Sequence, residues 1–126
     1  MDRLSLHKAR KLTKEYQKMV PKDRVQLRKK RLYDLVTYAK ENSPLYADIY
    51  SGLKDNFTIR DLPVTDRDMY MNNYDRWSTD PQITHDSVNR YIQYYTDQSD
   101  LYLGEYYITS SSGTDGNPLV SIHDAN

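Results

Sequence analysis

The sequence contains no cysteine, which excludes a disulfide scaffold and a thiolate metal site. It also contains no apolar run long enough to span a bilayer, so we expect no membrane partner. The first residues, Met1-Asp2-Arg3, lead into a charged helical pattern and not into the apolar core of a signal peptide. Together these absences favour a cytoplasmic protein.

Charge of both signs is abundant, and the net charge is zero, but the two signs are unevenly placed. Residues 1–31 hold 12 Lys and Arg against 3 Asp and Glu, whereas residues 32–126 hold 6 against 15. One interpretation is a basic arm that binds nucleic acid or anionic lipid. The other is a solvated basic helix pair on an acidic body. We favour the second, because the acidic remainder would repel a polyanion, and we expect no nucleic-acid partner.

Hydrophobic residues recur at helical spacing through most of the chain. Pro21 breaks the first helical pattern, because proline disfavours the helical conformation in the residue before it. Ser43 precedes a proline and is a typical helix N-cap, and Thr65 and Thr84 are expected to cap later helices. We expect helices over residues 4–19, 23–41, 44–51, 66–73 and 85–97, and one further turn at residues 58–61.

Each longer helix should bury one face. For the 23–41 helix the expected buried face is Val25, Leu32, Leu35, Val36 and Ala39. For the 85–97 helix it is Val88, Tyr91, Ile92 and Tyr95. Between these helices we expect three aromatic residues to pack on the body, namely Tyr70, Tyr74 and Trp77.

Two runs with strand character, residues 105–109 and 119–122, flank the polar loop 111–118. Small hydroxyl residues and two glycines allow such a loop to turn its backbone N–H groups toward an anion, which outlines a phosphate cradle. A plain hairpin turn remains the alternative. The fold class is therefore mainly α with a small C-terminal β-hairpin. Because a lone hairpin is marginal in water, we expect the N-terminal portion of a larger α/β protein or strands that pair with another copy.

Three stretches carry a family resemblance. They are Leu35-Val36-Thr37-Tyr38-Ala39-Lys40-Glu41-Asn42-Ser43-Pro44-Leu45-Tyr46, Asp61-Leu62-Pro63-Val64-Thr65-Asp66-Arg67 and Ser111-Ser112-Gly113-Thr114-Asp115-Gly116-Asn117-Pro118. They are similar to the patterns A-x-x-x-S-P-x-Y, L-P-x-T-x-K and S-S-G-T-T-G-x-P. In this order they resemble the N-terminal region of the phenylacetate–CoA ligase-like branch of the adenylate-forming enzymes. This branch includes capsule-biosynthesis adenylating proteins and acyl-protein synthetases.

The resemblance begins near residue 25, so we expect an N-terminal amphipathic helix over 1–22. Residues 23–126 are then the N-terminal helical part of an adenylation domain that ends in the phosphate-loop hairpin. The resemblance implies that a carboxylate substrate attacks ATP bound with Mg²⁺, and that the acyl group passes from the acyl-adenylate to coenzyme A or another acceptor. The residues expected to hold the phosphates are Ser111, Ser112, Gly113, Thr114, Asp115, Gly116 and Asn117.

Two loop positions depart from the family pattern. Asp115 stands where the family has a second threonine, and Asn117 stands where lysine is common. A carboxylate beside a phosphate is repulsive unless it meets Mg²⁺, and a lost cation removes a charge contact. The alternative is therefore a non-catalytic helical interaction module with a degenerate loop, which dimerises through a strand edge or a Tyr-rich surface. In either case residues 1–126 alone should be catalytically silent and bind ATP weakly or not at all.

Other polar residues have ordinary structural interpretations. The three histidines, His7, His85 and His123, are too scattered to suggest a metal site, and His85 is expected at the surface. Asp66 and Asp68 are best explained as acids at a helix start, where they face the positive end of the helix dipole. The tyrosine clusters at residues 91–95 and 102–107 could stack bases, but core and interface roles are favoured in these acidic surroundings.

Overall fold

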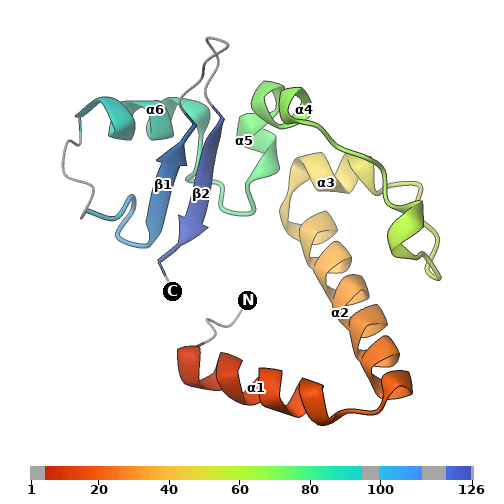
Figure 1. Cartoon of the computed structure of the whole chain (residues 1–126). Helices are drawn as coiled ribbons and strands as arrows, with labels where there is room; N and C mark the ends of the chain where they lie inside the picture. Colours follow the sequence, from red (N-terminus) through yellow and green to blue (C-terminus); the bar gives the residue numbers. More distant parts are fainter. Residues whose placement is uncertain (1–4, 95–99, 112–118, 126) are drawn as a thin grey trace.

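The computed structural model of the chain describes residues 5–94, 100–111 and 119–125. Within these ranges the chain is mainly helical, with six α-helices and one antiparallel pair of strands, as the sequence predicts. Helices α1 and α2 form an open corner, while α3, α4 and α5 gather at the far end of α2 (Figure 1). Helix α6 crosses the hairpin on its other side. No helix in these ranges combines the length and apolar composition needed to cross a bilayer.

Helix α1 (Leu6–Lys18) begins at Ser5, whose hydroxyl accepts a hydrogen bond from the Lys8 N–H. Helix α2 (Pro21–Asn42) begins at its proline, two residues earlier than predicted, because proline is well suited to the first helical position. Arg24 fixes the corner between the two helices. Its guanidinium donates to the carbonyls of Gln17 and Met19 at 2.6 and 2.9 Å, where α1 leaves its last carbonyls unpaired.

The predicted buried face of α2 is only partly correct. Val36 is buried, but Val25 and Leu35 are 39% and 54% exposed. Figure 1 shows a reason for Val25, since α3 and α5 lie against the C-terminal end of α2 and no helix or strand covers its N-terminal half. Leu35 lies beyond the midpoint of α2, in a pocket with Phe57 and Ile59, and is exposed all the same. Helical spacing fixes which residues share a face, but it does not fix whether a partner element arrives to cover that face.

The middle of the chain consists of short helices joined by caps. Helix α3 (Pro44–Ile49) ends two residues before its predicted end. A 3₁₀ turn, η1 (Ile59–Asp61), is closed by the predicted capping box with Thr58. Helices α4 (Arg67–Asn72) and α5 (Tyr74–Trp77) follow, where the sequence predicts one helix over 66–73.

The predicted cap of α4 is wrong by one residue. Asp66, not Thr65, is the N-cap, and its carboxylate accepts the Met69 N–H at 2.8 Å. The Thr65 hydroxyl instead shares a 2.6 Å hydrogen bond with the Tyr70 hydroxyl. An aspartate placed beside the threonine accepts the helix N–H equally well, so the threonine is available for a tertiary contact.

Helix α6 (His85–Tyr94) and the hairpin form the main core. Strand β1 (Tyr106–Ser110) pairs antiparallel with β2 (Val120–Asp124), in a register that runs from Tyr106 opposite Asp124 to Ser110 opposite Val120. The buried residues of this core are Tyr74, Ile83, Val88, Tyr102 and Val120. The core therefore joins α5 and α6 to the hairpin. Of the predicted α6 face, Val88 is buried, Tyr91 is half-buried, Ile92 is 41% exposed and Tyr95 lies outside the described residues.

Candidate functional site

The predicted phosphate loop lies in the sequence between β1 and β2. Ser112 to Pro118 lie outside the described residues, but both ends of the loop are placed. The Ser111 N–H donates to the Leu119 carbonyl at 2.9 Å, and the Leu119 N–H donates to the Ser111 hydroxyl at 2.8 Å. These two bonds close the loop at its base. Among the described residues the Ser111 hydroxyl accepts this one hydrogen bond and donates none, so its hydrogen could be donated to a ligand.

The base of this loop is anchored in the core. Val120, directly after Leu119, is 4% exposed and packs with Val88 of α6 and Tyr102. Ile108 and Ile122 pack against the same core. The strands that lead into and out of the loop therefore have fixed directions.

The first family-like stretch has its own anchor at Ser43, which is 1% exposed. Its hydroxyl lies 3.0 and 2.8 Å from the carbonyl oxygens of Arg76 and Trp77 and accepts the Tyr46 N–H at 3.4 Å. One side chain thus caps α3 and fastens the α2–α3 junction to α5. The sequence identifies Ser43 as a cap, but it carries no signal for the contact with α5, which lies 33 residues away.

The first and second family-like stretches are in contact through one tyrosine. Tyr70 shares hydrogen bonds with the hydroxyls of Tyr46, at 3.0 Å, and Thr65, at 2.6 Å. Tyr46 belongs to the first stretch and Thr65 to the second. Burial, followed by the hydrogen bond from Tyr70, raises the pKa of the Tyr46 phenol well above its ordinary value. The Tyr46 phenol therefore stays neutral at physiological pH, and its hydrogen bond with Tyr70 helps to join the two stretches.

Arg67 ends the second family-like stretch, where the family pattern has lysine. Its Nη2 atom is buried and has no hydrogen-bond partner among the described residues. Asp66 and Asp68, on either side, are exposed at the start of α4, and Asp66 is the N-cap. The two aspartates therefore act as acids at a helix start, as the sequence predicts.

A cleft of about 450 Å³ lies between the hairpin and the helices α2, α3 and α5. We call it the hairpin cleft. Its walls include Tyr38, Trp77, Asp80, Tyr106, Ile122 and Asp124. The Tyr106 hydroxyl donates to the Asp80 carboxylate at 3.0 Å. Burial and this hydrogen bond raise the pKa of the Tyr106 phenol to about 12. Aromatic rings and carboxylates together make the cleft suited to a cation with an apolar stem.

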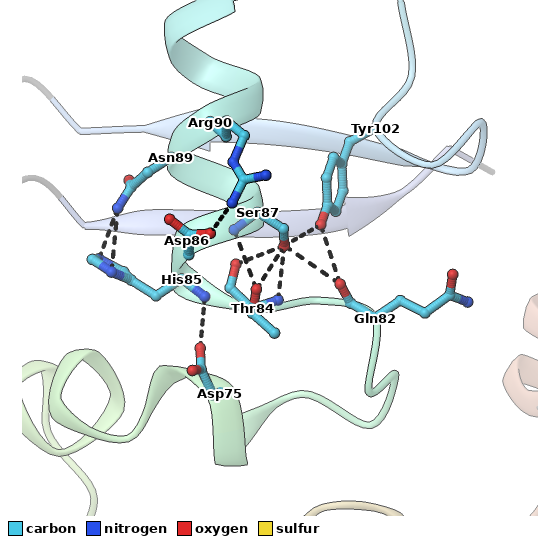
Figure 2. A network of polar contacts seen from close by, with 9 residues as sticks. All are labelled: Asp75, Gln82, Thr84, His85, Asp86, Ser87, Asn89, Arg90 and Tyr102. Atoms are coloured by element: carbon cyan, nitrogen blue, oxygen red, sulfur yellow. Dashed lines mark hydrogen bonds and ion pairs between the residues drawn. The ribbon is translucent and has the colours of Figure 1, made fainter.

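A second polar cluster surrounds the start of α6 (Figure 2). Thr84 and Ser87 form a reciprocal cap, in which each backbone N–H donates to the other residue's hydroxyl at 3.0 and 3.2 Å. The Ser87 hydroxyl also shares a 2.6 Å hydrogen bond with the Tyr102 hydroxyl. From α5, Asp75 accepts the His85 N–H at 2.6 Å. The cluster ties α5, α6 and the segment before β1 together, and its hydroxyls are occupied by one another.

The remaining predicted residues are structural where the structure describes them. His85 is exposed, as predicted, and its ring lies edge-on to Tyr74 with 5.5 Å between ring centroids. Within the described ranges no group of three or more His, Asp and Glu side chains could hold a metal ion. Of the tyrosine clusters, Tyr102 is buried and Tyr106 is half-buried.

The sequence did not predict three contacts. They are the hydrogen bonds of Tyr70 with two hydroxyls, the hydrogen bond of Ser87 with Tyr102, and the place of Asp80 in the hairpin cleft. The spacing of Thr84 and Ser87 could have identified their reciprocal cap. The contact of Ser87 with Tyr102 and the other two missed contacts depend on tertiary packing. Comparisons of the chain with protein-family models, with curated proteins and with solved structures found no match.

Proposed function

We propose that this chain is the N-terminal part of an ATP-dependent, carboxylate-activating ligase of the adenylate-forming superfamily. Such an enzyme makes an acyl-adenylate and transfers the acyl group to coenzyme A or another acceptor. ATP with Mg²⁺ supplies the leaving pyrophosphate in this chemistry. The contribution of this chain is the loop 111–118, whose hydroxyl and backbone N–H groups bind and orient the phosphates.

The observation that carries the proposal is the hairpin that closes this loop. The strands stay in register up to Ser110 and Val120, and Ser111 adds two hydrogen bonds with Leu119. In this proposal the described bonds hold the two ends of a polar, glycine-containing loop together, and the N–H groups of the loop would bind the anion. The hydrogen bonds of Tyr70 with Tyr46 and Thr65 lend further support, because they join the other two family-like stretches.

Asp115 and Asn117 weaken phosphate binding relative to the family pattern, and the loop alone does not make an enzyme. Residues 1–126 should therefore show no adenylation activity and no low-micromolar affinity for ATP. Calorimetry of the isolated chain with ATP-Mg²⁺ checks this expectation. Low-micromolar binding would mean that the nucleotide site is complete within this chain.

The test of the proposal is carboxylate-dependent exchange of pyrophosphate into ATP, measured on the protein that carries this chain with a broad panel of carboxylates. Exchange with at least one carboxylate supports the ligase. The alternative function is a non-catalytic interaction module, which the exposed apolar residues of α1 and α2 favour, since Leu6, Val25 and Leu35 are 69%, 39% and 54% exposed. No exchange with any carboxylate would support that alternative.

A further inference from the structure

Helix α1 is a basic amphipathic helix without a covering element. Within the described part of the chain, none of its residues is buried. Its half-exposed residues, Ala9, Leu12 and Tyr16, share one face, and the lysines lie around the rest of the helix. A 13-residue helix is marginal in water when its apolar face is open, so a partner for this face would stabilise it.

The corner at Arg24 holds α1 away from the body. The Arg24 guanidinium bonds two carbonyls at the end of α1 and lies over the Tyr16 ring, 5.5 Å from its centroid. Figure 1 shows α1 extending from the end of α2 with no other helix or strand beside it. Helix α1 therefore projects from the end of α2 with its apolar face uncovered, and we call this helix the arm.

The hairpin cleft is complementary to this arm. Its rings and apolar side chains, including Trp77 and Ile122, suit the apolar face of α1, and its carboxylates, Asp80 and Asp124, suit the lysines. The charges agree, because α1 has five Lys and Arg against one Glu, whereas residues 32–126 carry a balance of −9. A chain with this division of charge is complementary to its own copy.

The arm cannot reach the cleft of its own chain while both helices persist. At about 1.5 Å of rise per residue, Leu12 lies about 14 Å along α1 from Pro21, whereas Tyr38 lies about 26 Å along α2. If α1 folded back along α2, Leu12 would therefore stop about 12 Å short of Tyr38 at the cleft. Leu12 therefore does not meet Tyr38 of its own chain in this arrangement, which favours a second copy as the source of the docking helix.

We propose that α1 of one copy docks in the hairpin cleft of a second copy, and that the exchange is reciprocal. Leu12 and Tyr16 contact the aromatic walls, and the lysines of α1 face Asp80 and Asp124. The same two patches are buried on both protomers, as twofold symmetry requires. This dimer uses surfaces other than the loop, so its test is independent of the ligase proposal.

The test is sedimentation velocity of the chain over a concentration series up to about 100 µM, at low and high salt. We expect a dimer that weakens as salt rises. Leu12→Gln should raise the dissociation constant at least about tenfold, because it removes an apolar anchor. His7→Gln, on the opposite face of α1, is the matched control and should leave the constant unchanged. On the cleft side, Asp124→Lys should weaken the dimer, whereas Asp68→Lys on α4 should not.

A mixture of two variants distinguishes the contribution of the arm from that of the cleft. Leu12→Gln protein retains an intact cleft, and Asp124→Lys protein retains an intact arm, so mixing the two should restore one arm–cleft contact and some heterodimer. Circular dichroism confirms that each variant is folded. A chain that stays monomeric up to about 100 µM overturns the proposal, and so does a dimer unaffected by Leu12→Gln and Asp124→Lys. Binding of a monomer to phosphatidylserine vesicles through α1 would assign the arm to a lipid surface instead.

Discussion

At the residue scale, Ser43 makes more tertiary contacts than its cap position implies. Its hydroxyl contacts two carbonyls of α5 and caps α3, and the residue is 1% exposed. Ser43→Ala should lower the free energy of unfolding by about 1–2 kcal/mol, because it removes a cap and takes a partner from the carbonyls of Arg76 and Trp77. Urea denaturation measures the change.

Ser51→Ala is the control for this substitution. Ser51 is exposed, and its hydroxyl makes no hydrogen bond among the described residues, so the free energy of unfolding should change by less than about 0.5 kcal/mol. Equal effects of the two substitutions would show that the bonds from Ser43 to α5 contribute nothing to stability.

Tyr74 presents the opposite case, a buried hydroxyl without a partner. The residue is 3% exposed, and its hydroxyl has no hydrogen-bond partner among the described residues. Burial raises the pKa of its phenol from 10.0 to about 12. The Tyr74 phenol ionises near pH 10 in the unfolded chain and near pH 12 in the folded chain. The contribution of the neutral phenol to stability is therefore complete below pH 10. It is lost between about pH 10 and 12 and amounts to about 2–3 kcal/mol.

Tyr74→Phe should therefore be neutral or slightly stabilising at pH 7, since it removes an unsatisfied buried hydroxyl. It should also reduce the loss of stability between about pH 10 and 12. Part of that loss will remain, because burial and the hydrogen bond to Asp80 raise the pKa of Tyr106 to about 12 as well. Urea unfolding at a series of pH values checks both points. A Phe variant with the same alkaline loss as the wild type would assign the effect to other groups.

At the element scale, the turn before β1 depends on left-handed backbone. Gly104 has φ of 71°, and Leu103 before it has φ of 53°. Gly104→Ala should lower the free energy of unfolding by about 1 kcal/mol, because a Cβ is disfavoured in this conformation even where space is open. Thermal unfolding measures the effect.

Gly52 provides the matched control. A Cβ at either glycine would meet nothing within 4 Å, but only Gly104 has a positive φ. Gly52→Ala should therefore be neutral or stabilising, since it restricts the unfolded chain. A loss of stability at Gly52 equal to that at Gly104 would show that conformation does not explain the difference.

Elements whose signals are local were predictable from the sequence, and elements that depend on a distant partner were not. Ser43 and Thr84 each mark a helix start through their own chemistry, and the structure has helices at both. Pro21 was expected only to break the first helical pattern, and it is also the first residue of α2.

The predicted burial of Val25 and Leu35 was wrong. Val25 required a neighbour that the topology does not bring to the N-terminal half of α2. At Leu35 the nearby segment with Phe57 and Ile59 leaves the side chain exposed.

In the candidate site, too, features with local signals were predictable and contacts with distant partners were not. The strands on either side of the loop were predictable from their β-prone residues, and their register closes the loop at Ser111. The contact of Tyr70 with Tyr46 was not predictable, because one helical position gives no sign of a partner 24 residues away. The contact with Thr65, five residues away, was missed because Thr65 was expected to cap α4. The role of residues 112–118 stays a prediction.

At the scale of the whole molecule, the chain divides into a basic arm and an acidic body. The arm is presented by the Arg24 corner, and the body contains the core, the hairpin cleft and the loop. The two proposals use different parts of this arrangement, since the dimer needs α1 and the cleft while phosphate binding needs the loop. Variants of the arm should therefore alter association without altering adenylation chemistry.

The central claim is that the loop 111–118 binds the phosphates of ATP. The most direct measurement is carboxylate-dependent pyrophosphate exchange by the protein that carries this chain, compared across loop variants. Thr114→Ala should reduce exchange about tenfold by removing a donor, and Asp115→Thr with Asn117→Lys should increase it about tenfold by removing repulsion and adding a cation. Asp68→Asn, outside the loop, should change nothing. Exchange that ignores all loop changes, or is absent with every carboxylate, would contradict the account.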